Sequence, residues 1–322
     1  MTDTTASDQL CIHTDLEDGA GGSNTSRFCI PIYITNSLGV NLTKETDLIP
    51  AKGAEPKIRS GTLTFVRREG QVYGITCRHV VEALEDAEVT AHKDWLERIG
   101  DIPAPPGGHL GFRFPGPTEQ IHVNARFYKA YIDPFTKRGK DLAIARIPSD
   151  TFSKINREAI PFDRTGLPPG NASSHLCGIA TGFPEQSRIQ RPADGVVSVL
   201  SMPTVTAWAR FDAVNETSLR LYGELSDLPA ANNLSGMSGG PIFWSDTGGW
   251  GLAGIVKKGL DMHPTTHEAE GMTPIFDRSK IWVEGEPLTT SILDDLIAAI
   301  PADDPAIPYW ITTLIPVGQH RR

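Results

Sequence analysis

Short runs of β-branched and aromatic residues, each closed by glycine or proline, constrain the fold of this chain most strongly. The first half holds FCIPIYIT (28–35), GTLTFVRR (61–68) and QVYGITC (71–77), and REGQ between the last two predicts a hairpin turn. The second half repeats the pattern in HLCGIATGF, SLRLYGEL and WGLAGIVKK. The chain has 31 glycines and 25 prolines in 322 residues, so many short strands are favoured over long helices.

This pattern predicts an all-β protein with two antiparallel barrels and one C-terminal helix. The expected segments are a flexible leader (1–26), a first barrel (27–150), a Pro-rich linker (151–172), a second barrel (173–287), and a helix with a tail (288–322). Within the last segment, SILDDLIAAI (291–300) has helical spacing before Pro301, and we expect this helix to pack against the second barrel. Residues 99–119, rich in proline and glycine, read as a surface insertion.

Composition and charge exclude several classes of function. The formal net charge is −9 without a basic stripe, so nucleic acid is not an expected partner. No apolar run spans a membrane and the first ten residues are polar, which predicts a cytoplasmic protein without a membrane partner.

No metal and no cofactor are expected. The four cysteines form no CxxC pair, and reduced thiols are the simpler interpretation. His263 and His267 have the separation of a helical metal pair, but Pro264 between them disfavours a helix. The chain also lacks a phosphate-binding loop placed between a strand and a helix.

The segment NLSGMSGGPIFW (233–244) crowds glycines around Ser238. Glycines let backbone amides point at one position, so this loop could form an oxyanion hole around a nucleophilic serine. A tight turn between two strands would have the same composition, and the loop alone does not decide between them.

A serine nucleophile needs a base, and His79 is the best placed of nine histidines. It follows the apolar strand ITC, where the chain turns into the segment HVVEALED, for which a short helix is predicted. Asp141, at the start of the apolar run DLAIARI, could orient the imidazole. Taken alone, His79 is more often a histidine bonded to backbone, and Asp141 an exposed capping residue.

In chain order, ITCRHVV, DLAIARI and GMSGGP resemble the three catalytic motifs of the chymotrypsin/trypsin-like serine proteases. CGIATGFP (177–184) is similar to the start of the second barrel in the bacterial high-temperature-requirement branch, and GLAGIVKKG (251–259) to the substrate-pairing strand. The resemblance covers roughly residues 55–260 and implies two six-stranded barrels. It implies a serine protease in which Ser238 attacks, His79 transfers the proton and Asp141 orients His79, with the amides of Gly236 and Ser238 as the oxyanion hole.

Three residues depart from the family pattern. Met237 replaces an aspartate of the secreted branch, so activation by a new N-terminus is not expected. Cys77 precedes the histidine where the secreted branch has a disulfide-bonded cysteine after it. Lys257 stands where the family has a small residue that helps to hold the aspartate, and it could compete with His79 for Asp141 or turn aside. That competition would make the protein latent until a protein partner or substrate rearranges the site.

The resemblance also gives an expected substrate pocket. The bottom of this pocket is expected near Asn232, with Val256 and Lys257 beside it and Gly259 at the entrance. None of these is acidic, so cleavage after an uncharged residue of a protein or peptide substrate is expected. The alternative is a catalytically silent member of the fold that binds peptides or proteins.

Overall fold

The structure is a computed structural model. It describes residues 12–19, 23–34, 59–86, 111–115, 120–124, 126–131, 135, 139–170, 176–184, 189–193, 197–201, 203–224, 236–259 and 280–302.

The first half of the chain forms a mostly antiparallel sheet. Its strands follow the order β1-β2-β3-β7-β6, and β8 pairs with β2 in parallel. Their bounds are β1 (Cys29–Ile34), β2 (Arg59–Arg68), β3 (Gln71–Thr76), β6 (Tyr128–Lys129), β7 (Ala143–Ile147) and β8 (Ile160–Pro161). The predicted hairpin turn is confirmed between β2 and β3, where Glu69 and Gly70 both have positive φ, as a type I′ turn requires.

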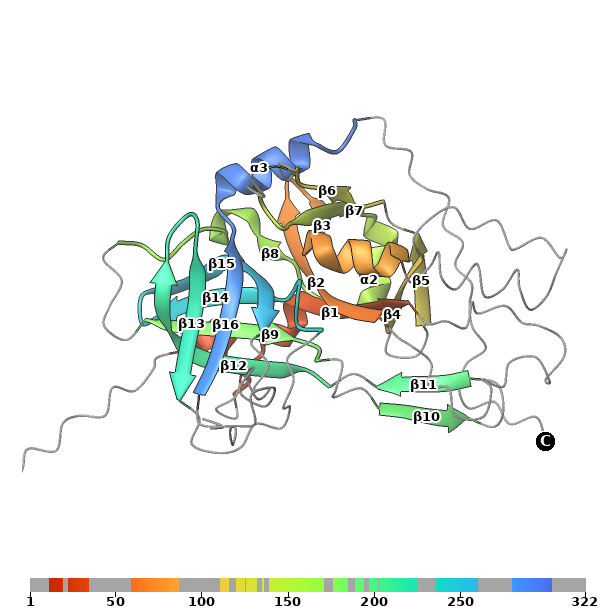
Figure 1. Ribbon diagram of the computed structural model, residues 1–322, viewed down its shortest axis with the longest axis horizontal. Coiled ribbons are helices and arrows are strands. Elements are labelled where there is room, and N and C mark those ends of the chain that lie inside the picture. Colours follow the sequence, from red (N-terminus) through yellow and green to blue (C-terminus); the bar gives the residue numbers. More distant parts are fainter. Residues whose placement is uncertain are drawn as a thin grey trace, which may run out of the picture.

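The second half forms a closed six-stranded barrel (Figure 1). The barrel order is β12-β13-β16-β15-β14-β9. Its strands are β9 (Cys177–Gly182), β12 (Val205–Val214), β13 (Leu219–Glu224), β14 (Pro241–Asp246), β15 (Gly249–Gly259) and β16 (Lys280–Pro287). The mostly β architecture and one antiparallel barrel are therefore confirmed. The residues that the structure describes do not close the N-terminal sheet, so the expected first barrel (27–150) stays a prediction.

The remaining strands form two separate two-stranded sheets. They are β4 (Gly111–Pro115) with β5 (Gln120–Asn124), and β10 (Ile189–Ala193) with β11 (Val197–Ser201). Strand β4 lies within the expected insertion 99–119, of which the other residues are outside the described part of the chain. The segment after β3 is helical over 78–86, as predicted, and two short helices follow β7, α2 (Ser149–Ile155) and η3 (Phe162–Arg164).

Part of the expected flexible leader is packed against the barrel. Residues 12–19 and 23–26 are described and include the helix η1 (Thr14–Leu16) and the start of η2 (Thr25–Phe28). Leu16 is fully buried, and the backbone amide of His13 donates to Ser245 Oγ at 2.7 Å. An isolated leucine among polar residues gave little sign of this docking.

The helix α3 (Thr290–Ala298) confirms the helical spacing of the C-terminal segment. Its packing extends beyond the expectation, because the cluster that it joins contains residues of the N-terminal sheet as well as of the barrel. Leu293 and Leu296 join the core formed by β2, β3 and β7, and Asp294 forms an ion pair with Arg68 of β2. Figure 1 shows α3 above the ends of β6 and β7.

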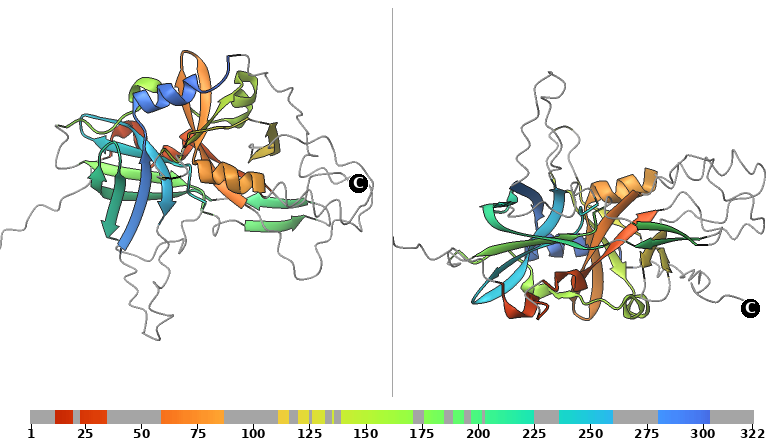
Figure 2. Two further views of the ribbon diagram at one scale, coloured as in Figure 1. Left: turned by 45° about the horizontal axis from the view of Figure 1, so that its top comes forward. Right: turned by 90° about the horizontal axis from the view of Figure 1, so that it is seen from below.

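The two halves share one hydrophobic core. Phe28, which precedes β1, lies 5.6 Å from Phe243 and 5.8 Å from Trp250 of the barrel, measured between ring centroids. Figure 2 shows the sheet and the barrel side by side. Residues carried by the two halves can therefore be held at a fixed separation across their junction.

Candidate active site

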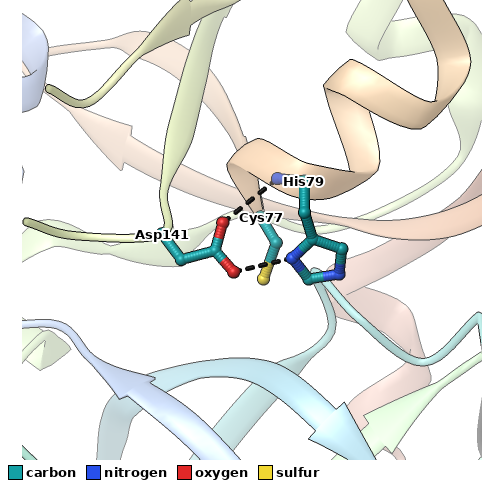
Figure 3. A group of neighbouring side chains, drawn as sticks. All are labelled: Cys77, His79 and Asp141. Carbon is teal, nitrogen blue, oxygen red and sulfur yellow. Dashed lines mark hydrogen bonds and ion pairs between the residues drawn. The ribbon is translucent and has the colours of Figure 1, made fainter. Parts of the chain in front are cut away.

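His79 and Asp141 emerge from neighbouring strands of the first sheet. β3 and β7 pair antiparallel, with Thr76 opposite Ala143, so the residues after β3 and before β7 lie at the same edge. His79 Nδ1 lies 2.6 Å from Asp141 Oδ2, and the backbone amide of His79 donates to Asp141 Oδ1 at 3.1 Å (Figure 3). Both carboxylate oxygens are thus engaged by one residue, which fixes the ring and leaves the other ring nitrogen directed away from Asp141.

The two side chains differ in exposure. Asp141 is 13% exposed and His79 is 47% exposed, so the carboxylate is enclosed while the imidazole faces solvent. A buried carboxylate needs partners, and the histidine supplies them. The pair can orient a base and stabilise its charged form.

The Ser238 loop is held in a tight conformation by its glycines. Gly236 and Gly239 have φ of 95° and 94°, and the amide of Gly240 donates to the Met237 carbonyl at 2.9 Å. A Cβ at Gly239 would lie 1.9 Å from the Thr62 carbonyl oxygen, so a larger residue does not fit there. Within the described residues, the amides of Gly236 and Ser238 donate no hydrogen bond, which leaves both available to an oxyanion.

Threonines of β2 attach this loop to the first sheet. Thr62 Oγ1 donates to the Gly236 carbonyl at 3.0 Å and accepts from the Phe183 amide at 3.2 Å. Thr64 Oγ1 donates to the Gly239 carbonyl at 2.8 Å, and the Thr62 amide donates to the Ser238 carbonyl at 2.8 Å. Sequence reasoning missed both threonines, since alternating threonines in a strand signal only β-propensity.

The Ser238 hydroxyl donates to the Lys257 carbonyl at 3.0 Å. Among the described contacts it makes no hydrogen bond with His79. Lys257 is the extra residue at an irregularity in the β15–β16 pairing, between Val256 and Lys258. Such bulges redirect a strand at functional sites, and here the bulge turns a carbonyl toward the serine.

Lys257 does not pair with Asp141, as the hypothesis of competition would require. Its Nζ lies 3.5 Å from Glu286 Oε2. Glu286 also lies 3.4 Å from Lys140 Nζ through its other oxygen. Glu286 was missed in the sequence, because nothing in KIWVEGEP (280–287) indicates that one of its two glutamates is buried beside the site.

The expected substrate pocket is only partly described. Asn232 lies outside the described residues, and Gly259 is the last residue of β15. Val256 is fully buried in the barrel core, so its side chain lines no open pocket. Its backbone instead braces the serine loop, since its carbonyl accepts from the Gly239 amide and its amide donates to the Gly240 carbonyl.

Cys77, His79 and Asp141 bring three donor atoms within 4.8 Å of one another, which is a spacing that a metal ion could bridge. Each donor already has a protein partner, because the Cys77 thiol donates to the Val256 carbonyl at 3.1 Å. Burial raises the pKa of this thiol well above its usual value, and the Asp141 carboxylate raises it further. In this structure the three side chains are thus held in place by protein hydrogen bonds. His263 and His267 lie outside the described residues.

The fold and the site together define a β-barrel protein with a hydrogen-bonded histidine–aspartate pair and a glycine-rich serine loop that the threonines of β2 attach to the same sheet. A scan against protein-family models gives no match, and a search of curated protein sequences gives none either. In the described part of the chain, no helix is long and apolar enough to cross a membrane.

The solved structures to which this chain is similar include serine proteases. A thermostable serine protease from an extremophilic microorganism gives a TM-score of 0.42 at 12% identity, over 85% of this chain and 97% of that one. The protease Anisep from Arthrobacter nicotinovorans gives 0.40 at 12% identity, over 85% and 95%. A human pathogenic astrovirus serine protease gives 0.31 at 13% identity, over 70% and 82%. These likenesses are too weak to carry an argument about activity, which rests on the side chains of the site.

Proposed function

We propose that this protein is a serine endopeptidase in which Ser238, His79 and Asp141 form the catalytic triad. The observation that carries the proposal is the double contact of Asp141 with the amide and Nδ1 of His79. This contact fixes the tautomer in which the opposite ring nitrogen, Nε2, can accept a proton. The Ser238 loop, with its two available amides, supports the assignment.

In the proposed reaction, Ser238 Oγ bonds to the carbonyl carbon of the scissile peptide and its proton passes to His79 Nε2. The carbonyl electron pair moves to oxygen, where the amides of Gly236 and Ser238 stabilise the negative charge. The carbon–nitrogen bond then breaks and His79 returns the proton to the leaving amine. A water molecule then attacks the acyl carbon in the same way and gives its proton to His79. The bond to Ser238 Oγ breaks, His79 returns the proton to Ser238, and the acyl group is released. The serine hydroxyl must first leave the Lys257 carbonyl, and catalytic hydrogen bonds often tighten only when substrate is bound.

The end of β15 can bind the substrate backbone. In the described structure, Lys258 and Gly259 pair only with β16 and Lys257 is bulged out of that ladder, because β14 begins at Pro241 opposite Ile255. An extended peptide can therefore add to the open side of β15 as a further strand. A protein or peptide substrate fits this arrangement.

A catalytically silent peptide-binding protein is the second candidate. The hydrogen bond from Ser238 to the Lys257 carbonyl, in place of one to His79, favours it. The same observation fits a latent protease that a substrate or protein partner activates. A cytoplasmic location belongs to the proposal, since the buried Cys29 and Cys77 are in no disulfide among the described residues, as a reducing compartment allows.

Digestion of a peptide library tests the proposal. The wild-type protein is expected to cut after uncharged residues, and Ser238→Ala, purified identically, is expected to leave the library intact. Fragments from both proteins would reveal a contaminating protease and contradict the assignment. Cleavage dominated by Lys or Arg would leave the triad in place but contradict the expected specificity.

A further inference from the structure

Glu286 is a buried carboxylate beside the candidate active site that the proposed reaction does not use. Its side chain is 8% exposed, yet it lies on β16, near the end of the described chain and far in sequence from the triad. Burying a carboxylate is costly unless cations or donors compensate it. Two lysines do so here, Lys257 at 3.5 Å and Lys140 at 3.4 Å.

Both lysines come from segments that build the site. Lys140 directly precedes Asp141, and its Nζ also donates to the Glu216 carbonyl at 2.7 Å. Lys257 is the bulged residue whose carbonyl accepts from Ser238. Glu286 stands opposite Ile255 in the β15–β16 ladder, two residues before Lys257, so its carboxylate can reach the lysine without distortion.

Lys257 also lies close to Asp141 along the chain of contacts through Cys77. The Cys77 sulfur lies within 4.8 Å of the Asp141 carboxylate, beside the His79–Asp141 pair (Figure 3). The same sulfur donates to the carbonyl of Val256 at 3.1 Å, and Lys257 is the next residue after Val256. The long side chain of Lys257 therefore starts near Asp141 as well as near Glu286. The pKa of Cys77 agrees, since Asp141 and Glu286 raise it and Lys257 lowers it.

An ammonium group on Asp141 would weaken the candidate triad. Asp141 Oδ1 and Oδ2 are both engaged by His79, and a cation in this partly enclosed place would compete for them. The attraction between opposite charges is stronger here than in water, because the surroundings exclude solvent. In the described structure Lys257 pairs with Glu286, and Asp141 keeps both contacts with His79.

We infer that Glu286 is a positioning residue that holds the Lys257 ammonium away from Asp141, so that Asp141 orients His79. The inference rests on the proposed triad. It assigns β16 a part in the site beyond closing the barrel. It also explains how a lysine can occupy this position in a protein with a working base.

The test uses the full chain and four variants: Glu286→Gln, Glu286→Asp, Lys257→Met, and the double variant Glu286→Gln with Lys257→Met. The first readout is the downfield proton NMR resonance of His79 Nδ1–H, which reports the hydrogen bond to Asp141 without requiring activity. The second is the rate at which a fluorophosphonate probe labels Ser238. Glu284→Gln is the matched control, because it removes the same charge from the same strand at a residue with no ion pair among the described residues.

Glu286→Gln is expected to shift or broaden away the Nδ1–H resonance and to slow labelling about tenfold, a fraction of what a general base contributes. Lys257→Met alone gives the baseline for both readouts without the ammonium. In that background the added Glu286→Gln substitution should have little further effect, since the competing ammonium is gone. Glu286→Asp keeps the charge but shortens the reach, so it should move the resonance in the same direction. It also provides the test if Glu286→Gln does not fold.

Equal effects of Lys257→Met in both backgrounds would overturn the inference, because they would mean that the two residues act independently. An unchanged resonance in Glu286→Gln and Glu286→Asp would overturn it as well. Failure of the proposed function would look different: the wild-type protein would not be labelled at Ser238, while the NMR comparison would still decide where Lys257 lies.

Discussion

Thr62 joins the two halves of the molecule through one hydroxyl group. It donates to the Gly236 carbonyl and accepts from the Phe183 amide, and all three residues are buried. A residue of the N-terminal sheet thereby holds the peptide between Gly236 and Met237. This peptide lies between the two proposed oxyanion donors, so their placement depends on a residue of the other half.

Substituting Thr62 by valine, which has the same shape, should leave the Gly236 carbonyl and the Phe183 amide without a partner. We expect a loss of about 1–3 kcal/mol in the free energy of unfolding, measured by urea denaturation. Fluorophosphonate labelling should also slow, because the Gly236 peptide is free to rotate. Thr62→Ser retains the hydroxyl and serves as control. Equal free energies of unfolding for the valine and serine variants would show that the Thr62 hydroxyl does not stabilise the protein.

At the scale of elements, the strands that carry the candidate site could be predicted from sequence. The segments around His79, Asp141 and Ser238 are apolar runs bounded by turn residues, and they form β3, β7 and β14. Their order in the chain matched a known arrangement of catalytic residues, which turned three weak local signals into one prediction. The contact of His79 with Asp141 agrees with that prediction.

Other elements and partners could not be read in this way because their contacts are nonlocal. The amphipathic pattern of α3 fixes its buried face but not the surface that it covers, and the cluster that Leu293 joins includes residues of the N-terminal sheet as well as of the barrel. Glu286 looks like an exposed strand residue until the barrel closes and places Lys140 and Lys257 beside it. The bulge at Lys257 likewise depends on the pairing of β15 with β16.

At the scale of the whole molecule, burial of thiols predicts a loss of stability in alkali. Burial raises the pKa of Cys29 from 9.0 to about 12, against the opposing effect of Arg157. Between these values the unfolded chain loses the thiol proton and the folded chain keeps it. The free energy of unfolding should therefore fall by about 1.4 kcal/mol for each pH unit above 9 through this group alone.

Urea denaturation of the wild type and of Cys29→Ala at pH 8, 9, 10 and 11 measures this contribution. The Cys29→Ala variant should be less stable at pH 8, because it loses packing, and the difference should shrink as the pH rises. Parallel curves for the two proteins would mean that Cys29 does not titrate differently in the folded and unfolded chains.

The described part of the molecule joins an N-terminal sheet that carries His79 and Asp141 to a closed barrel whose strand β14 follows the Ser238 loop. The central claim is that these side chains form a working triad. The most direct measurement is the rate of fluorophosphonate labelling, with the modified residue mapped by mass spectrometry, for the wild type, His79→Ala and Asp141→Asn. The account predicts one label, on Ser238, that forms at least about 100-fold more slowly in both variants. Equal rates in the three proteins, a label elsewhere, or no label on the folded wild type would contradict it.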